Sequence, residues 1–174
     1  TITGGAGNDT IDLGASDAAQ DFVRLESSVA NNGIDTISNF GTQELITLDK
    51  SDYSLNGTAT ADSANTAIAG ATYYEGAAGS ATAGTAYDVI VLTGASYADV
   101  GAAEDAVAAQ ITSATDGFVL FHDTGTTQAH MYFDADNAAD GNLTATATVI
   151  TFEGVASAAD LGTLIGNTNF ELIA

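Results

Sequence analysis

The chain has 174 residues, enough for one domain with a packed core, and a formal net charge of −21 from 23 acidic and 2 basic residues. Such a charge repels nucleic acid and anionic membrane surfaces, and no apolar run is long enough to insert into a bilayer. The absence of cysteine excludes disulfides and thiolate chemistry. Because only 14% of residues are charged, the acidity reflects missing basic residues, and divalent cations are the expected counter-ions.

The first fifty residues alternate short β-branched segments with turns rich in glycine and asparagine. This pattern predicts short strands, each with one apolar side chain at its centre. The predicted strands cover residues 1–3, 10–12, 35–38 and 45–48. We therefore take residues 1–50 as a first unit.

Residues 4–12 read GGAGNDTID and match the calcium-binding nonapeptide G-G-x-G-x-D-x-U-x at every specified position. Glycine permits the turn conformations that a Cβ forbids, and the turn presents carbonyl oxygens beside a carboxylate. Hard oxygen ligands of this kind suit Ca²⁺. The pattern predicts a calcium site that uses Gly4, Gly5, Gly7 and Asp9, with Ile11 facing the core. The alternative is a simple glycine–asparagine turn.

Residues 30–38 form a decayed copy of the motif, which keeps Gly33, Asp35 and Ile37 but lacks the first two glycines. Asp35 is either a further calcium ligand or an ordinary turn residue. Stacked copies of the nonapeptide build a parallel β-roll with ions held between turns. One complete and one decayed copy predict at most the last turn or two of a roll.

Residues 51–85 are a low-complexity stretch of Ala, Gly, Ser and Thr, which we expect to form a surface loop or extended arm with at most one strand. Residues 86–174 read as a β-rich C-terminal module. The predicted elements of this module are a strand at 87–93, a helix at 97–112 that follows a capping box at 96–99, a hairpin of strands 117–123 and 127–133, a strand at 148–153, a short helix from Ser157 and a last strand at 170–174.

The expected fold class is therefore mainly β. A short, parallel, β-roll-like calcium turn leads into a β-sandwich-like module with one amphipathic α-helix.

A second acidic stretch begins at Asp134, where three aspartates and a glycine occur within residues 134–141. Alternate carboxylates on a turn chelate Ca²⁺, and Asp134 and Asp136 are the better placed ligands. The spacing differs from that of an EF-hand loop. An acidic hairpin turn explains the same residues equally well.

No set of residues in the sequence indicates catalysis. Asp123-Thr124-Gly125 resembles half of an aspartic protease site, which needs two such aspartates, so a turn is the better interpretation. The predicted hairpin would place His122 and His130 across from one another. A zinc site would need Asp123 as a third ligand, so a hydrogen-bonded or exposed pair of histidines is the better interpretation. The chain lacks a nucleophile elbow, a phosphate-binding loop and a His-Glu zinc motif, so we expect no enzymatic activity.

Taken together, the nonapeptide and the DTISNF run at 35–40 resemble the C-terminal part of repeats-in-toxin (RTX) proteins, which a type I secretion system exports. The segment from about residue 85 onward resembles the bluetail C-terminal modules of surface proteins, through HMYFDAD at 130–136 and ITFEGV at 150–155. The resemblance implies an extracellular or cell-surface protein of a Gram-negative or cyanobacterial cell. It also implies export as an unfolded chain and folding triggered outside by Ca²⁺.

In these families a type I exporter reads the C-terminal end of the chain. The residues that fit this role are Phe170, Glu171, Leu172, Ile173 and Ala174. The same residues fit a last strand, and both roles are compatible.

Two functions follow as hypotheses. The first is a calcium-dependent structural subunit of an S-layer, filament or adhesin that self-associates through strand edges into a lattice or filament. The second is the secretion and folding module at the C-terminal end of a larger secreted enzyme. Neither involves nucleic acid or membrane insertion.

Overall fold

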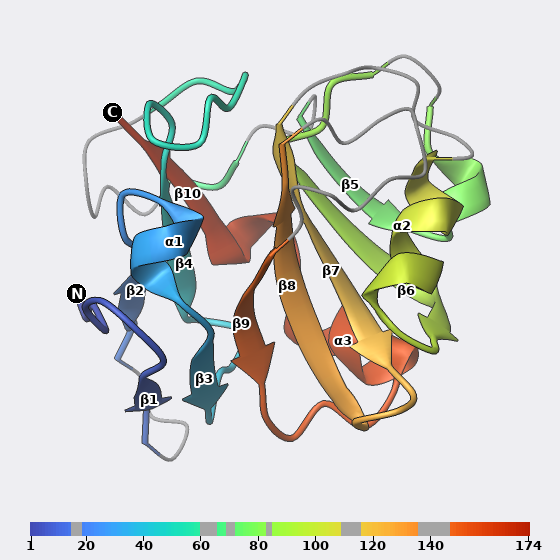
Figure 1. Ribbon diagram of the computed structural model, residues 1–174, viewed down its shortest axis with the longest axis horizontal. Helices are drawn as coiled ribbons and strands as arrows, with labels where there is room; N and C mark the ends of the chain where they lie inside the picture. Colours follow the sequence, from blue (N-terminus) through green and yellow to red (C-terminus); the bar gives the residue numbers. More distant parts are fainter. Residues whose placement is uncertain (15–18, 60–65, 69–71, 83–84, 109–115, 136–146) are drawn as a thin grey trace.

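The computed structural model describes residues 1–14, 19–59, 66–68, 72–82, 85–108, 116–135 and 147–174. The fold is mainly β, as predicted, with a seven-stranded and a three-stranded sheet (Figure 1). The strands are β1 (Thr10–Asp12), β2 (Phe22–Arg24), β3 (Asp35–Ser38), β4 (Leu45–Asp49), β5 (Tyr73–Gly76), β6 (Val89–Tyr97), β7 (Gly117–Asp123), β8 (Gln128–Asp134), β9 (Ala147–Phe152) and β10 (Phe170–Ile173). The helices are α1 (Val29–Asn32), α2 (Val100–Ala108) and α3 (Ala158–Leu164), with 3₁₀ turns at Ala78–Ser80 and Asn167–Asn169.

Successive strands at the start of the chain alternate between the two sheets. The large sheet has the order β1-β3-β9-β8-β7-β6-β5, and the small sheet has the order β10-β4-β2. All neighbours among β1, β3 and β9, and among β2, β4 and β10, run parallel. Ile2 forms an isolated parallel bridge with Val23 of β2. The last strands of the chain therefore resume the alternation that the first strands begin.

The alternation is maintained by in-register apolar side chains. In the large sheet Ile11 pairs with Ile37, which pairs with Phe152, and all three are at most 5% exposed. In the small sheet Val23, Ile46 and Phe170 form the equivalent row. Both rows belong to one apolar core. Since side chains alternate between the faces of a strand, one buried residue at each strand centre fixes the register.

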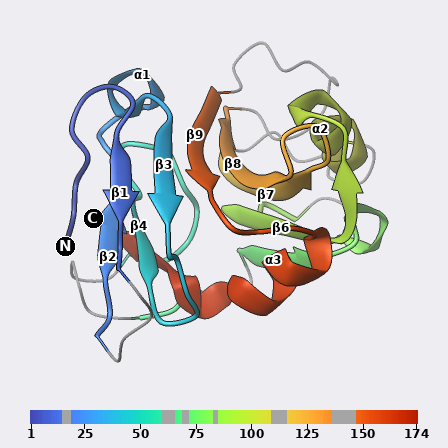
Figure 2. The same cartoon turned by 90° about the horizontal axis from the view of Figure 1, so that it is seen from below.

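Strands β5 to β8 extend the large sheet beyond β9. β5, β6 and β7 are parallel, while β7-β8 and β8-β9 are antiparallel. Figure 2 shows α2 and α3 on opposite faces of this part of the sheet. Leu161 of α3 joins the core shared with the small sheet, whereas Ala103 and Val107 of α2 join a second core against Val119 and Phe121. β7 is buried on both faces, as a central strand covered by helices should be.

The hairpin at 117–133 and the helix that follows Ser157 are confirmed. β7 and β8 pair from Gly117 with Asp134 to Asp123 with Gln128, and the Ser157 hydroxyl accepts a hydrogen bond from the backbone N–H of Asp160. β2 and the single-turn helix α1 were not predicted. α1 is too short to show a helical period in the sequence.

The predicted capping box at 96–99 is wrong. β6 continues past a bulge to Tyr97, which pairs with Asp123 of β7, so Ser96 belongs to the strand. The side chain of Asp99 instead accepts the N–H of Ala102 at 2.8 Å. α2 begins at Val100, three residues later than predicted, because strand pairing takes precedence over the local capping signal. The predicted end of this helix at 112 lies outside the described residues.

Replacing Gly33 with alanine should strongly destabilise the fold. Gly33 has a φ of +71°, and a Cβ there would lie 2.6 Å from the backbone C and O of Gly7. We expect the free energy of unfolding, measured with urea, to fall by about 2 kcal/mol or more. Gly79→Ala is the control, since its Cβ would meet no atom within 4 Å. Equal stability of the two variants would contradict this packing of the turns.

Candidate functional site

Two arrangements of polar side chains have the geometry of a binding site, and the first is the acidic pair Asp9 and Asp35. Each residue immediately precedes the first pair of the β1–β3 ladder, which joins Thr10 of β1 to Thr36 of β3. Parallel, in-register strands therefore bring the two carboxylates side by side. The backbone N–H of Asp9 donates to Asp35 Oδ1 at 3.0 Å.

The predicted glycine turn lies directly against this pair. A Cβ at Gly4 would lie 3.0 Å from Asp9 Oδ2 and 3.2 Å from Asp35 Oδ2, so only glycine leaves the space between these oxygens open. Gly5 and Gly7 adopt positive φ angles of 98° and 105°, which glycine adopts without strain. The structure thus brings together Gly4, Asp9 and Asp35, with the other two glycines shaping the turn.

The acidic pair lacks a compensating positive charge among the described residues. Asp9 Oδ2 is buried without a hydrogen-bond partner there. Asp35 is 3% exposed, and this burial raises its pKa. The nearby carboxylates of Asp9 and Glu26 raise the pKa further, whereas the hydrogen bond from the N–H of Asp9 lowers it. Glu26 was missed because no motif surrounds it in the sequence.

Both basic side chains of the chain are engaged elsewhere. The Nη2 atom of Arg24 lies 3.1 Å from Asp49 Oδ2. Lys50 donates to the carbonyl oxygen of Gly57 at 2.6 Å. Neither basic side chain is recorded in contact with Asp9 or Asp35, so neither one neutralises the pair.

The chemistry of the acidic pair fits a hard cation. It offers carboxylate oxygens beside a glycine turn, and one of these oxygens has no hydrogen-bond partner among the described residues. Within the described ranges, no three His, Cys, Asp or Glu side chains converge as a metal cluster, so backbone oxygens would have to complete a coordination sphere.

The other predicted ligands lie elsewhere. Asp134 is buried at the end of β8, two strands away from β3, and is not brought to the acidic pair. Asp136 lies outside the described residues.

The C-terminal residues form β10. Phe170 to Ile173 pair in parallel with β4, and all four are buried, with only Ala174 exposed. The interpretation as a last strand is therefore correct for the folded chain, while the export role stays a prediction.

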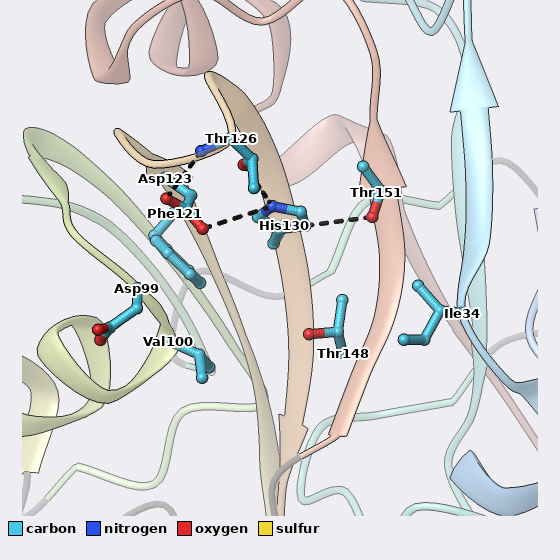
Figure 3. A pocket seen from close by; sticks show the side chains of 9 residues that line it. All are labelled: Ile34, Asp99, Val100, Phe121, Asp123, Thr126, His130, Thr148 and Thr151. Carbon is cyan, nitrogen blue, oxygen red and sulfur yellow. Dashed lines mark hydrogen bonds and ion pairs between the residues drawn. The ribbon is translucent and has the colours of Figure 1, made fainter.

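The second arrangement is a cleft on the face of the large sheet that α2 partly covers. We call it the His130 cleft (Figure 3). It has a volume of about 310 Å³ and is lined by Ile34, Asp99, Val100, Phe121, Asp123, Thr126, His130, Thr148 and Thr151. An adjoining hollow of about 530 Å³ shares Ile34 and Thr148 and is otherwise lined by Val29, Ala30 and Gly33.

His130 is the centre of the polar side of the cleft. Its Nε2 lies 2.9 Å from Thr126 Oγ1, and its Nδ1 lies 3.1 Å from Thr151 Oγ1. Asp123 Oδ2 lies 3.7 Å from Nε2, while Asp123 Oδ1 accepts from the backbone N–H of Gly125. Burial lowers the pKa of His130, Asp123 partly opposes this, and His122 adds to it.

The two histidines do not form a pair across the hairpin. His130 is opposite Phe121, and His122 is opposite Ala129, so the imidazoles point to different faces of the sheet. His122 Nδ1 lies 2.9 Å from Ser96 Oγ instead.

The sequence did not predict that Thr151 and Ile34 belong to the cleft, since they come from segments far from the hairpin in sequence.

Comparison with protein-family models, curated proteins and solved structures finds no match to this chain. Among the described residues, no helix combines the length and the apolar character that crossing a bilayer requires. A functional conclusion therefore has to rest on the two sites.

Asp35→Asn should stabilise the protein in the absence of divalent cations. The amide keeps the oxygen that accepts the N–H of Asp9 and removes a buried charge next to another carboxylate. In EDTA we expect the free energy of unfolding to rise by up to about 1 kcal/mol. Asp105→Asn, which removes an exposed charge from α2, is the control. A destabilised Asp35→Asn variant in EDTA would show that the pair is not repulsive.

His130 should make the protein less stable at mildly acidic pH. The folded-state pKa of His130 lies below the ordinary value of 6.5. The stabilisation of the folded chain by neutral His130 is therefore fully present above pH 6.5 and is lost as pH falls through the folded-state pKa. The difference in unfolding free energy between wild type and His130→Gln should therefore shrink as pH falls. Urea titrations at several pH values measure it, and a pH-independent difference would contradict the burial of the neutral imidazole.

Proposed function

We propose that this chain is a calcium-stabilised structural module of an extracellular surface protein and has no catalytic activity of its own. The observation that carries the proposal is the acidic pair. Asp9 and Asp35 meet beside Gly4, and Asp9 Oδ2 is buried with no partner among the described residues. Burying a carboxylate without compensation is costly, and a bound cation removes that cost.

Gly4, Gly5, Gly7, Asp9 and Asp35 would hold the calcium ion. When bound, Ca²⁺ would neutralise the two carboxylates and tie the first turn to the second. The N–H of Gly7 donates to Asn31 O, and Asn8 Oδ1 accepts the N–H of Ile34. These bonds already join the turns, so the ion would stabilise a contact that the backbone has prepared.

We further infer that the alternating parallel strands are turns of a β-roll with a long insertion. Ile2, β2 and β4 lie on one side of this roll, and β1 and β3 lie on the other. Residues 50–146 would interrupt it, and β9 and β10 would add its last turn. The in-register rows centred on Ile37 and Ile46 support this interpretation, since stacked turns need one apolar residue per strand.

The composition of the site favours a weak calcium affinity. Two carboxylates and neutral carbonyl groups give a low ligand charge, and extracellular calcium modules bind with Kd values of roughly 10⁻⁴–10⁻³ M. Such a site would be empty in a cell interior with little free Ca²⁺ and filled outside. This matches the RTX-like route of export through a type I exporter before folding. The burial of β10 requires that its residues be read before the strand forms.

Self-association through strand edges is the mode of assembly that we propose. β1 and β5 are the outermost strands of the large sheet within the described residues. Unpaired strand edges are templates for another strand. Two copies that each carry a formal charge of −21 repel one another, so Ca²⁺ would also favour assembly by screening that repulsion.

Calcium should raise the thermal stability of the wild-type chain, and the acidic pair should account for this effect. We expect Asp9→Asn and Asp35→Asn each to weaken calcium binding by about tenfold or more, measured by isothermal titration calorimetry. Asp105→Asn should leave the affinity unchanged. The proposal fails if wild type shows no saturable binding below about 10 mM Ca²⁺, or if Asp105→Asn weakens binding as much as Asp9→Asn.

Assembly should depend on the same ion. Light scattering and electron microscopy of the wild-type chain should show larger particles with Ca²⁺ than with EDTA, and Asp9→Asn should abolish the difference. Particles of the same size in both conditions would contradict calcium-dependent assembly while leaving calcium binding intact.

A further inference from the structure

We propose that the His130 cleft binds an organic cation, namely a primary ammonium group attached to a short apolar chain. This inference is independent of the calcium site. It rests on the shape of the cleft, on the position of Asp123 and on the absence of a positive charge among the side chains that line it.

The charges of the lining residues favour a cation. Asp99 and Asp123 are among them, and neither Lys nor Arg is. Arg24 and Lys50 are engaged elsewhere, and burial keeps His130 neutral at pH 7 because it lowers the pKa. An anionic ligand would therefore meet only repulsion in a chain of formal charge −21.

Asp123 supplies the decisive acceptor. This residue is only 9% exposed, and its Oδ1 is held by the backbone N–H groups of Gly125 and Thr126. Its Oδ2 lies 3.7 Å from His130 Nε2, which is beyond hydrogen-bonding distance. Figure 3 shows this oxygen directed toward the imidazole at the floor of the cleft. An ammonium group has three donors, and the hydroxyl of Thr126 lies near the same atoms.

The opposite end of the cleft is apolar. Ile34 is 43% exposed, and no other large hydrophobic side chain in the described residues is exposed. It joins the cleft to the hollow lined by Val29 and Ala30. Figure 3 places Ile34 across the cleft from Asp123, so a ligand with a charged head and an apolar tail would satisfy both ends.

Two other ligand classes fit less well. A metal ion would need more ligands than His130 and Asp123, and no third His, Cys, Asp or Glu in the described residues completes a cluster. A sugar would need an exposed aromatic face, and Phe121 is 1% exposed. The volume of about 310 Å³ lies at the small end of ligand pockets, which favours a ligand of about amino-acid size.

Two-dimensional NMR of the full chain, titrated with n-pentylammonium chloride, tests the inference. We expect saturable shifts of the His130 ring signals and the Ile34 and Thr151 methyl signals, both in EDTA and in excess calcium. 1-Pentanol and pentanoate have tails of matched length, and neither should produce saturable shifts. Equal binding of either one would overturn the assignment of an ammonium site.

Substitutions then separate the two ends of the cleft. Asp123→Asn keeps the oxygen that caps the hairpin turn and should weaken binding about tenfold, whereas Asp105→Asn on the outside of α2 should not. Ile34→Ala should weaken binding roughly fourfold, the equivalent of one buried methylene group. The inference is wrong if Asp123→Asn and Asp105→Asn bind equally, or if calcium chloride alone shifts the His130 signals and competes with the amine.

Discussion

The structure depends on the parallel pairing of the end of the chain with its beginning. β9 pairs with β3, and β10 pairs with β4, so residues near 150 and 170 complete sheets that the first fifty residues start. Without these pairs, Ile37 would lose its neighbour Phe152, and Ile46 would lose its neighbour Phe170. The large core therefore includes side chains from Ile11 to Leu172, and its formation requires nearly the whole chain. Long-range parallel pairing of this kind forms slowly, because loop closure precedes any gain from contacts.

The second constraint is charge. The only Arg and the only Lys of the chain both serve the small sheet and the loop after it, where they pair with Asp49 and with backbone carbonyl groups. Other carboxylates of the described residues accept hydrogen bonds from backbone N–H groups, side-chain amides or hydroxyl groups. Asp88 is satisfied by backbone N–H groups: it is fully buried and accepts hydrogen bonds from the N–H groups of Asn56 and Gly57. Asp9 differs from Asp88, because one of its oxygens is buried without a hydrogen-bond partner in the described residues.

The two candidate sites meet at the start of β3. Asp35 points toward the glycine turn, and the preceding residue, Ile34, lines the His130 cleft. Successive side chains of an extended segment point to opposite sides, so neighbouring residues serve different sites. The N–H of Ile34 is held by Asn8 Oδ1, which belongs to the same turn as the acidic pair. An ion bound there would thus order the backbone that carries one wall of the cleft.

The sequence by itself determined the local features. The nonapeptide specified the glycine turn and the central position of Ile11, since positive φ angles and alternating burial are properties of a few consecutive residues. The hairpin and the Ser157 cap were equally readable. Only the tertiary structure decided which strands are neighbours, that β6 continues through Ser96, and that Thr151 and Ile34 join His130. Some of those contacts join residues more than one hundred positions apart. The free energy that selects them comes from packing in the assembled core, and a local sequence pattern does not contain that information.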